Sequence, residues 1–149
     1  MLPNGIINAI HIPEDGTIWT AHGIIKNTCG IWKKTIDGQE EVYNTDNSNL
    51  NYNWISTLKH DASGNLWSGT DAPIYLDDKT LHGGIQSFIN TDFIAHNPAD
   101  SGKATNRVTA MEFDCNGNLW VATSPDAPTF NLGIICLQRN GIVCAILRN

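Results

Sequence analysis

Short stretches of the chain alternate apolar and polar residues, and one such stretch occurs three times. It covers residues 7–12, 55–60 and 108–113, and its main apolar positions coincide without gaps in the three copies. Alternation with a period of two predicts a β-strand with one buried face. Three copies of one pattern predict a repeat architecture.

A turn and a second strand follow each of these stretches. Asp61 and Asp114 stand three residues before a glycine, and Pro13 takes that place in the first copy. An aspartate there can accept hydrogen bonds from the backbone of the turn, and glycine tolerates a positive φ. The second strand opens with two large apolar residues: Ile18-Trp19, Leu66-Trp67 and Leu119-Trp120. Because neighbouring residues of a strand point to opposite faces, we expect both faces to be covered and the three tryptophans to lie in the core of stacked sheets.

A third strand, opened by glycine, and a shorter, more polar fourth strand complete each copy. Asp37-Gly38 and Asn140-Gly141 are hairpin signals between these two strands. The copies recur at intervals of about 50 residues, which is the size of a propeller blade. The expected fold is therefore all-β, one propeller-repeat domain over 1–149, with three four-stranded antiparallel blades at about 3–46, 50–97 and 104–147.

Composition narrows the class of protein. The formal net charge is −6 and no cluster of basic residues exists, so the chain lacks the electrostatic footprint of a nucleic-acid-binding protein. No apolar run approaches the ~20 residues that a transmembrane helix needs, so membrane insertion is not expected. Met1 is not followed by a basic and then an apolar segment, so no signal peptide is expected. The chain is cytoplasmic if it is whole, and periplasmic or extracellular if it is part of a longer exported sensor.

The cysteines do not form a metal-binding pattern. No C-x-x-C pair occurs among Cys29, Cys115, Cys136 and Cys144, so a structural zinc site is not expected. Cys136 and Cys144 flank the turn at Asn140-Gly141. A three-residue loop would place them opposite each other, and a two-residue loop would offset them. Buried free thiols are the expected state.

The turn and the second strand resemble the two-component-regulator propeller repeat. Residues 61–70 and 114–123 follow that family's pattern Asp-x-x-Gly-Asn-Leu-Trp-x-x-Thr, and Leu2-Pro3-Asn4 with 15–19 follows the family more loosely. The likeness covers the first two strands of each copy. It implies a β-propeller that serves as the extracytoplasmic sensor of a regulatory kinase and recognises ligands such as oligosaccharides. The long loops at 71–83 and 124–132 depart from the family's short link.

Three blades do not close a ring, and proteins of the family carry more repeats. An open arc would leave apolar residues exposed on its two end blades, and we expect these to be Trp19, Ile31, Leu119 and Ile134. Two arrangements stay open. In the favoured one, two copies pair head to tail as a homodimer and build a six-bladed ring. In the other, the chain is a fragment of a larger propeller, and the remaining blades of a longer chain complete the ring.

The loops after the second strands and the segments that lead into the first strands are expected on one rim. They carry carboxylates, amides, an arginine and aromatic rings, which suit an oligosaccharide or a peptide. His22 stands where the other copies have threonine, so we expect it at the channel mouth. The candidate ligand-binding residues are Tyr52, Asn53, Trp54, Asp71, Asn106, Arg107, Asp126 and His22. Structural roles stay open for five of them: the two aspartates as turn residues of their Asp-Ala-Pro segments, the two asparagines as caps of strand starts, and the arginine as the partner of an acid in a neighbouring blade.

The expected function is a non-catalytic ligand-binding or sensing module, with no catalytic residue, metal or cofactor. The sequence contains no nucleophile elbow, no phosphate loop and no histidine pair at metal-ligand spacing. One alternative is a metal-dependent enzyme similar to streptogramin lyase, a related propeller, with His22, Asp71 and Asp126 near the metal. The other alternative is a structural scaffold for protein–protein interactions.

Overall fold

The computed structural model describes residues 5–23, 30–71, 84–96, 107–124 and 133–138, and the backbone of 143–148. In these ranges the chain forms strands and turns and no helix, so none of the described segments can cross a membrane as a helix. The strands are β1 (Ile7–His11), β2 (Ile18–His22), β3 (Ile31–Lys34), β4 (Glu40–Tyr43), β5 (Ile55–His60), β6 (Leu66–Thr70), β7 (Ile85–Ile89), β8 (Asp92–Ala95), β9 (Val108–Phe113), β10 (Leu119–Thr123), β11 (Gly133–Leu137) and β12 (Val143–Arg148).

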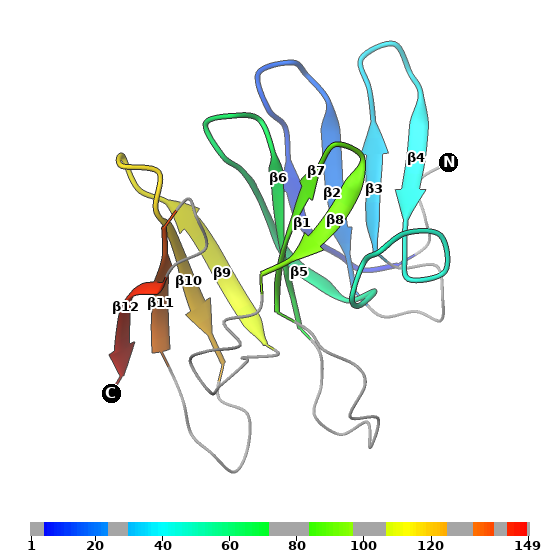
Figure 1. The fold of residues 1–149 in the computed structure, drawn as a ribbon. Helices are drawn as coiled ribbons and strands as arrows, with labels where there is room; N and C mark the ends of the chain where they lie inside the picture. Colours follow the sequence, from blue (N-terminus) through cyan, green and yellow to red (C-terminus); the bar gives the residue numbers. More distant parts are fainter. Residues whose placement is uncertain are drawn as a thin grey trace, which may run out of the picture.

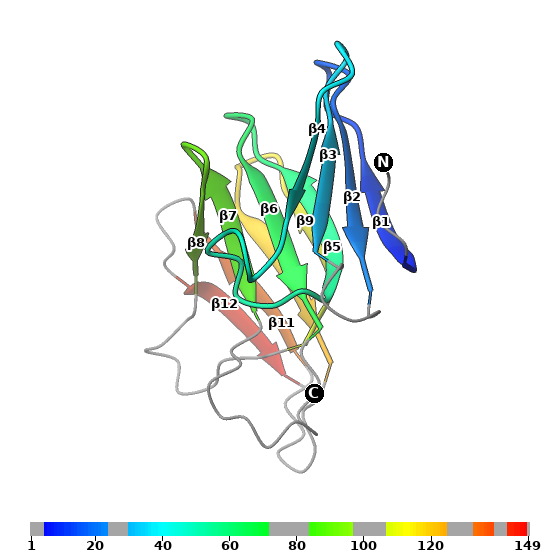
Figure 2. The same cartoon turned by 90° about the vertical axis from the view of Figure 1, so that its right-hand side faces the viewer.

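The strands form three separate four-stranded antiparallel sheets, each in simple chain order: β1 to β4, β5 to β8, and β9 to β12. We call these sheets blades 1, 2 and 3. The all-β prediction and the three-blade prediction are confirmed. Figure 1 shows the blades side by side, and the turned view in Figure 2 shows their strands running in similar directions. The first strands β1, β5 and β9 contact one another in series, as the innermost strands of propeller blades do.

The turn after each first strand is held by the aspartate that the sequence singled out. The Asp114 carboxylate accepts hydrogen bonds from the backbone N–H groups of Asn116 and Asn118, from the Asn118 side chain, and from the Trp120 indole at 2.9 Å. Asp61 repeats this network with Ser63, Asn65 and Trp67. The indole and the other donors lower the pKa of Asp114 to about 2. The motif is therefore a structural device: one charged side chain ties the turn to the second strand.

Gly64 and Gly117 close these turns with φ of 81° and 79°. Such values favour glycine because a side chain would clash with the backbone there. The sequence expectation of positive φ at both positions is confirmed.

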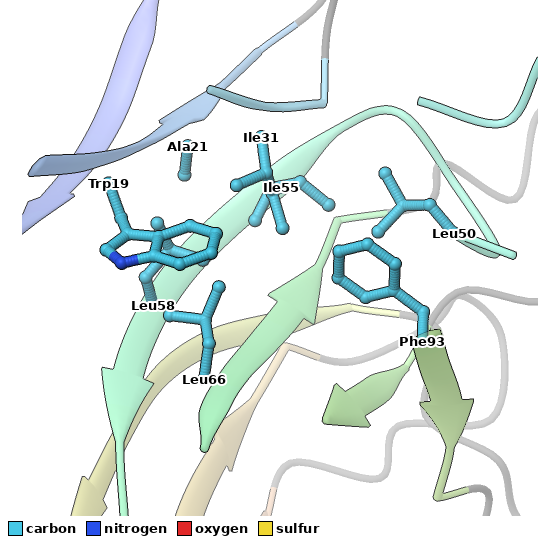
Figure 3. Close-up of a cluster of buried hydrophobic side chains, with 8 residues drawn as sticks. All are labelled: Trp19, Ala21, Ile31, Leu50, Ile55, Leu58, Leu66 and Phe93. Atoms are coloured by element: carbon cyan, nitrogen blue, oxygen red, sulfur yellow. The ribbon is translucent and has the colours of Figure 1, made fainter. Parts of the chain in front are cut away.

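Two apolar cores lie between the blades. Trp19, Ala21 and Ile31 of blade 1 meet Ile55 and Leu58 of blade 2, as the close-up in Figure 3 shows. Between blades 2 and 3 the corresponding core contains Trp67, Ile85, Val108, Met111, Leu119, Val121, Ile135 and Leu137. Leu66 belongs to the first core and its neighbour Trp67 to the second. Both faces of blade 2 are thus covered, as its Leu-Trp pair predicted.

Two expectations about the end blades are corrected. Trp120 is only partly buried, unlike the other two tryptophans of this motif, because it lies on the face of blade 3 that none of the described blades covers. Three of the residues expected to be exposed are buried because they face blade 2. The exposed fractions of Trp19, Ile31 and Leu119 are 5%, 1% and 1%. Alternation along a strand predicts two faces, but it does not say which of them meets the next blade.

The cysteine prediction is wrong for Cys136, which is in a disulfide. This residue is 2% exposed and pairs in the ladder with Ala145, and the register shifts before the next pair, Leu137 with Val143. Cys115 is an exposed free thiol. Cys29 lies outside the described residues, as do the side chains of β12.

Candidate functional site

Three segments meet at the end of blades 2 and 3 where the first strands begin. The segment before β5 meets the end of β6, where the backbone N–H of Asp71 donates to the carbonyl oxygen of Trp54 at 3.0 Å. Asp71 and Arg107 then form an isolated antiparallel bridge, and Ser124 donates to the Arg107 carbonyl at 3.0 Å. Backbone hydrogen bonds therefore fix the spacing of the side chains on this rim.

An ion pair joins blade 2 to blade 3 on the rim. The Arg107 Nε lies 2.7 Å from Asp71 Oδ1, and Nη2 lies 3.5 Å from Oδ2. The two side chains are 32% and 23% exposed, so the pair is open to solvent and contributes roughly 1 kcal/mol or less to stability. Its two-point geometry orients both groups, which matters more for recognition than its energy does.

Tyr52 and Trp54 are partly buried residues of the segment that reaches this pair, and the Trp54 carbonyl accepts the hydrogen bond from Asp71. Burial and the negative charge of Asp71 raise the pKa of Tyr52, so the phenol stays protonated and remains a hydrogen-bond donor at neutral pH. We call Tyr52, Trp54, Asp71 and Arg107 the rim cluster. It combines aromatic surface, a phenol, a carboxylate and a guanidinium without net charge.

The remaining candidate residues lie elsewhere. Asn53 accepts a hydrogen bond from the backbone of Thr45 at 2.8 Å and donates to the Thr45 hydroxyl at 2.9 Å, so it braces the link between blades 1 and 2. His22 is 1% exposed, and its Nε2 lies 2.8 Å from the Thr20 hydroxyl. Burial lowers the pKa of His22, and its Nδ1 has no partner. Its ring is therefore buried and is not open to a channel mouth. Asn106 and Asp126 lie outside the described residues.

The threonines equivalent to His22 have a structural role. The Thr70 hydroxyl lies 2.5 Å from the backbone nitrogen of Gly84, which donates to it, and the Thr123 hydroxyl donates to the Gly133 carbonyl at 3.2 Å. Each threonine thus joins the end of the second strand to the start of the third. This explains why threonine ends the motif.

The structure also shows two grooves at the opposite end of the blades, which the sequence reasoning missed. One, of about 590 Å³, lies between the first turns of blades 1 and 2 and is lined by His11, Asp15 and His60. The other, of about 380 Å³, lies between blades 2 and 3 and is lined by His96 and Cys115 among others. Both grooves depend on contacts between blades, which no single repeat encodes. An alignment of the repeats could have indicated the first groove, because His11 of the first repeat and His60 of the second fall on neighbouring columns of that alignment.

The histidines of the grooves are held neutral. The rings of His11 and His60 stack with centroids 4.8 Å apart. Burial lowers the pKa of His60 to about 4. The His96 ring stacks on Trp67 at 4.6 Å, and burial lowers its pKa as well. Within the described part of the chain, no three histidine, cysteine or acidic side chains lie close enough together to hold a metal ion.

The chain matches no protein-family model and no curated protein. Its fold is similar to solved extracellular domains from B. thetaiotaomicron. One belongs to a protein named as a hybrid two component system, BT3049, with 19% identity and a TM-score of 0.60 over 90% of this chain. Two belong to BT4673, named as a hybrid two component system in one structure and as a one component system in the other. They show 16% and 14% identity, and TM-scores of 0.66 and 0.55 over 94% and 99% of this chain.

The chain spans 17%, 18% and 24% of the length of those three solved chains. The likeness shows the fold, and it is consistent with the resemblance of the sequence to the two-component-regulator propeller repeat.

Proposed function

We propose that this chain is a ligand-binding part of a sensor propeller, and that the rim cluster recognises a neutral oligosaccharide. The observation that carries the proposal is that the segment with Tyr52 and Trp54 meets the Asp71–Arg107 pair at a junction of two blades: Trp54 accepts a backbone hydrogen bond from Asp71, and the charge of Asp71 acts on Tyr52. The similar solved domains are extracellular parts of signalling systems, which supports a sensing role.

The chemistry of the cluster favours a sugar over a charged ligand. The carboxylate and the guanidinium neutralise each other, so the cluster offers donors and acceptors without a net field. Sugars present hydroxyl groups, which bond to such groups, and apolar ring faces, which pack on aromatic side chains. The net charge of −6 further disfavours an anionic ligand.

The disulfide at Cys136 supports a location outside the cytoplasm. Disulfides persist in oxidising compartments and are rare in reducing ones. The compartment in which the similar domains work is also extracellular.

Binding without catalysis is the role that the cluster supports best. Asp71 and Arg107 are engaged with each other, and His22 is buried in blade 1 with its Nε2 against Thr20. None of these described groups is placed as a base beside a free nucleophile, as acid–base or covalent catalysis requires.

A glycan array followed by calorimetric titration with the selected oligosaccharide tests the proposal. We expect Tyr52→Phe to weaken binding about two- to thirteenfold, since one hydrogen bond contributes about 0.5–1.5 kcal/mol. Tyr43→Phe is the matched control, because Tyr43 is also partly buried but bonds to Glu41 on the outer strand of blade 1. Equal affinities for the Tyr52→Phe variant and the wild type would contradict the assignment of the site, and selective capture of peptides instead of glycans would contradict the ligand class.

A further inference from the structure

On the face of blade 1 that points away from blade 2, the first strand is apolar and exposed. Thr20, His22 and Trp32 lie farther out on the same face and are buried. On and just after β1, Ile7, Ile10 and Ile12 are 46%, 63% and 56% exposed. Ile10 pairs with Thr20 and Ile7 with His22, and these partners alternate with Trp19 and Ala21, which face blade 2. The isoleucines therefore lie on the outward face of the first blade.

The equivalent positions of the other two blades are buried. Ile55 and Leu58, equivalent to Ile7 and Ile10, are 0% and 3% exposed because they pack against blade 1. In blade 3, Val108 and Met111 are 1% and 4% exposed against blade 2. Each first strand thus presents this row to the preceding blade, and only β1 lacks that neighbour in the described chain.

The residues equivalent to Ile12, His60 in blade 2 and Phe113 in blade 3, also lie against the preceding blade. His60 lies 5.9 Å from the Trp19 ring, and Phe113 lies 6.0 Å from the Trp67 ring, measured between centroids. Ile12 is therefore placed to meet the tryptophan of a preceding blade.

Blade 3 presents the complementary row. Trp120, Ala122 and Ile134 are equivalent to Trp19, Ala21 and Ile31, which are 5%, 0% and 1% exposed where blade 2 covers them. In blade 3 the tryptophan and the alanine are only partly buried, and Ile134 is 43% exposed. This row is the surface on which a first strand such as β1 packs at both existing junctions.

The centre of that row must be small. A Cβ at Gly69 would lie 2.5 Å from Val108 Cγ1 of the next blade, and the equivalent residues are Ala21 and Ala122. At the junction of blades 1 and 2 an alanine, Ala21, already shares a buried core with the isoleucine Ile55, and Ala122 with Ile7 would repeat that pair.

A polar contact repeats as well. The Ser56 hydroxyl lies 3.0 Å from the Gly69 carbonyl of its own blade and 2.5 Å from the Val108 carbonyl of the next blade. The equivalent Thr109 hydroxyl already lies 3.2 Å from the Ala122 carbonyl and is exposed. Ile7 is equivalent to Val108, so the Ile7 carbonyl of a following blade would be the second acceptor for the Thr109 hydroxyl.

We propose that the outward face of blade 1 binds the outward face of blade 3 of a second copy, so that two chains close a six-bladed ring. A second copy is the occupant because one chain carries both halves of the junction, built from the residues that already form its two internal junctions. A head-to-tail contact closes when the rotation between units fits, and six blades lie within the range of known propellers. The ligand proposal does not depend on this junction, because the rim cluster lies between blades 2 and 3.

Light scattering on the chain, over a wide range of concentration, tests the ring. We expect twice the chain mass of 16.3 kDa. We expect Ile10→Glu and Ile134→Glu each to reduce the mass to that of one chain. Both side chains are exposed in the single chain, so these variants keep their fold, which circular dichroism checks. Ile94→Glu is the matched control, because Ile94 is 45% exposed on β8 of blade 2, away from both faces, and its mass should stay doubled.

Mixing the two variants separates a head-to-tail junction from other dimers. The Ile10→Glu chain keeps a normal blade 3 face and the Ile134→Glu chain keeps a normal blade 1 face, so the mixture should regain a two-chain species through one junction. A dimer that survives in either variant alone, or a mixture that does not recover, overturns the proposal. A wild-type mass of one chain at all concentrations overturns the second copy as the occupant and favours the alternative, in which the remaining blades of a longer chain cover these faces. A ladder of higher oligomers overturns the closed ring.

Discussion

Individual side chains at the blade junctions differ between repeats, and His60 shows the consequence. Its equivalents are Ile12 and Phe113, so a titratable ring takes the place of an apolar residue at the junction of blades 1 and 2. It lies against Trp19 and His11, with Asp15 and Asp61 nearby. Burial keeps it neutral and lowers its pKa to about 4 from 6.5.

This shift predicts a loss of stability in mild acid. Between pH 6.5 and about 4 the unfolded chain binds a proton at His60 that the folded chain does not, so stability falls as the pH falls through this interval. We expect the His60→Phe variant to lose about 1 kcal/mol less than the wild type between pH 7 and 4.5, a value reduced for the partial solvation of the ring. Denaturant unfolding midpoints across this pH range provide the measurement.

The reciprocal variant is the control. His11, His22 and His96 also have lowered pKa values and contribute to the wild-type slope, so the comparison must be made between variants. Phe113→His places the same ring at the equivalent position of blade 3 and should steepen the pH dependence. An unchanged slope in the His60→Phe variant would show that this ring is not kept neutral by the junction.

At the scale of the strands, the close approach of neighbouring blades depends on a small residue. A Cβ at Gly69 would lie 2.5 Å from Val108 Cγ1 and 2.9 Å from Thr57 Cγ2. We expect Gly69→Ala to cost about 1–3 kcal/mol of unfolding free energy, because the junction is overpacked. Urea unfolding of the variant measures this cost.

A second variant tests whether the cost comes from that contact. Val108→Ala removes the atom that the new methyl group meets and by itself leaves a cavity. If the contact is the cause, the double variant Gly69→Ala/Val108→Ala is more stable than the sum of the two single effects by about 1 kcal/mol or more. Additive effects would place the cost elsewhere, for instance in the backbone of β6.

Repetition explains which elements could be predicted from the sequence. The bounds of β5, β9 and β11 follow directly from the period-two stretches and the glycines before the third strands, and the Asp61 turn follows from its residue types. The faces of the end blades could not be predicted, because alternation does not say which row meets a neighbour. The same limit hid the two grooves, which arise only where turns of different blades meet.

The positions of some candidate site residues could be predicted from the sequence, and the position of His22 could not. Tyr52, Trp54, Asp71 and Arg107 were expected on one rim because they flank strand ends that a meander brings together, and the structure places them together. His22 was expected at the channel mouth from its position in the repeat. The structure buries it, as it buries Thr70 and Thr123 at the equivalent positions of the other two blades.

At the scale of the molecule, the strands separate the rim cluster from the histidine grooves. The rim cluster lies where the first strands begin, and the histidine grooves lie at the turns where these strands end. The proposed ring uses a third region, the outward faces of blades 1 and 3. A ring of two copies would therefore carry two rim clusters without altering either of them.

The indole N–H signals of the five tryptophans in a nuclear magnetic resonance spectrum test the central claim most directly. Trp54 belongs to the rim cluster, whereas Trp19, Trp32 and Trp67 are buried. On titration with the selected oligosaccharide, the account predicts a shift of the Trp54 signal, assigned by Trp54→Phe, while the buried indoles stay in place. An oligosaccharide that binds without moving the Trp54 signal, or that moves the signal of Trp67 beside the groove at the opposite end, would contradict it.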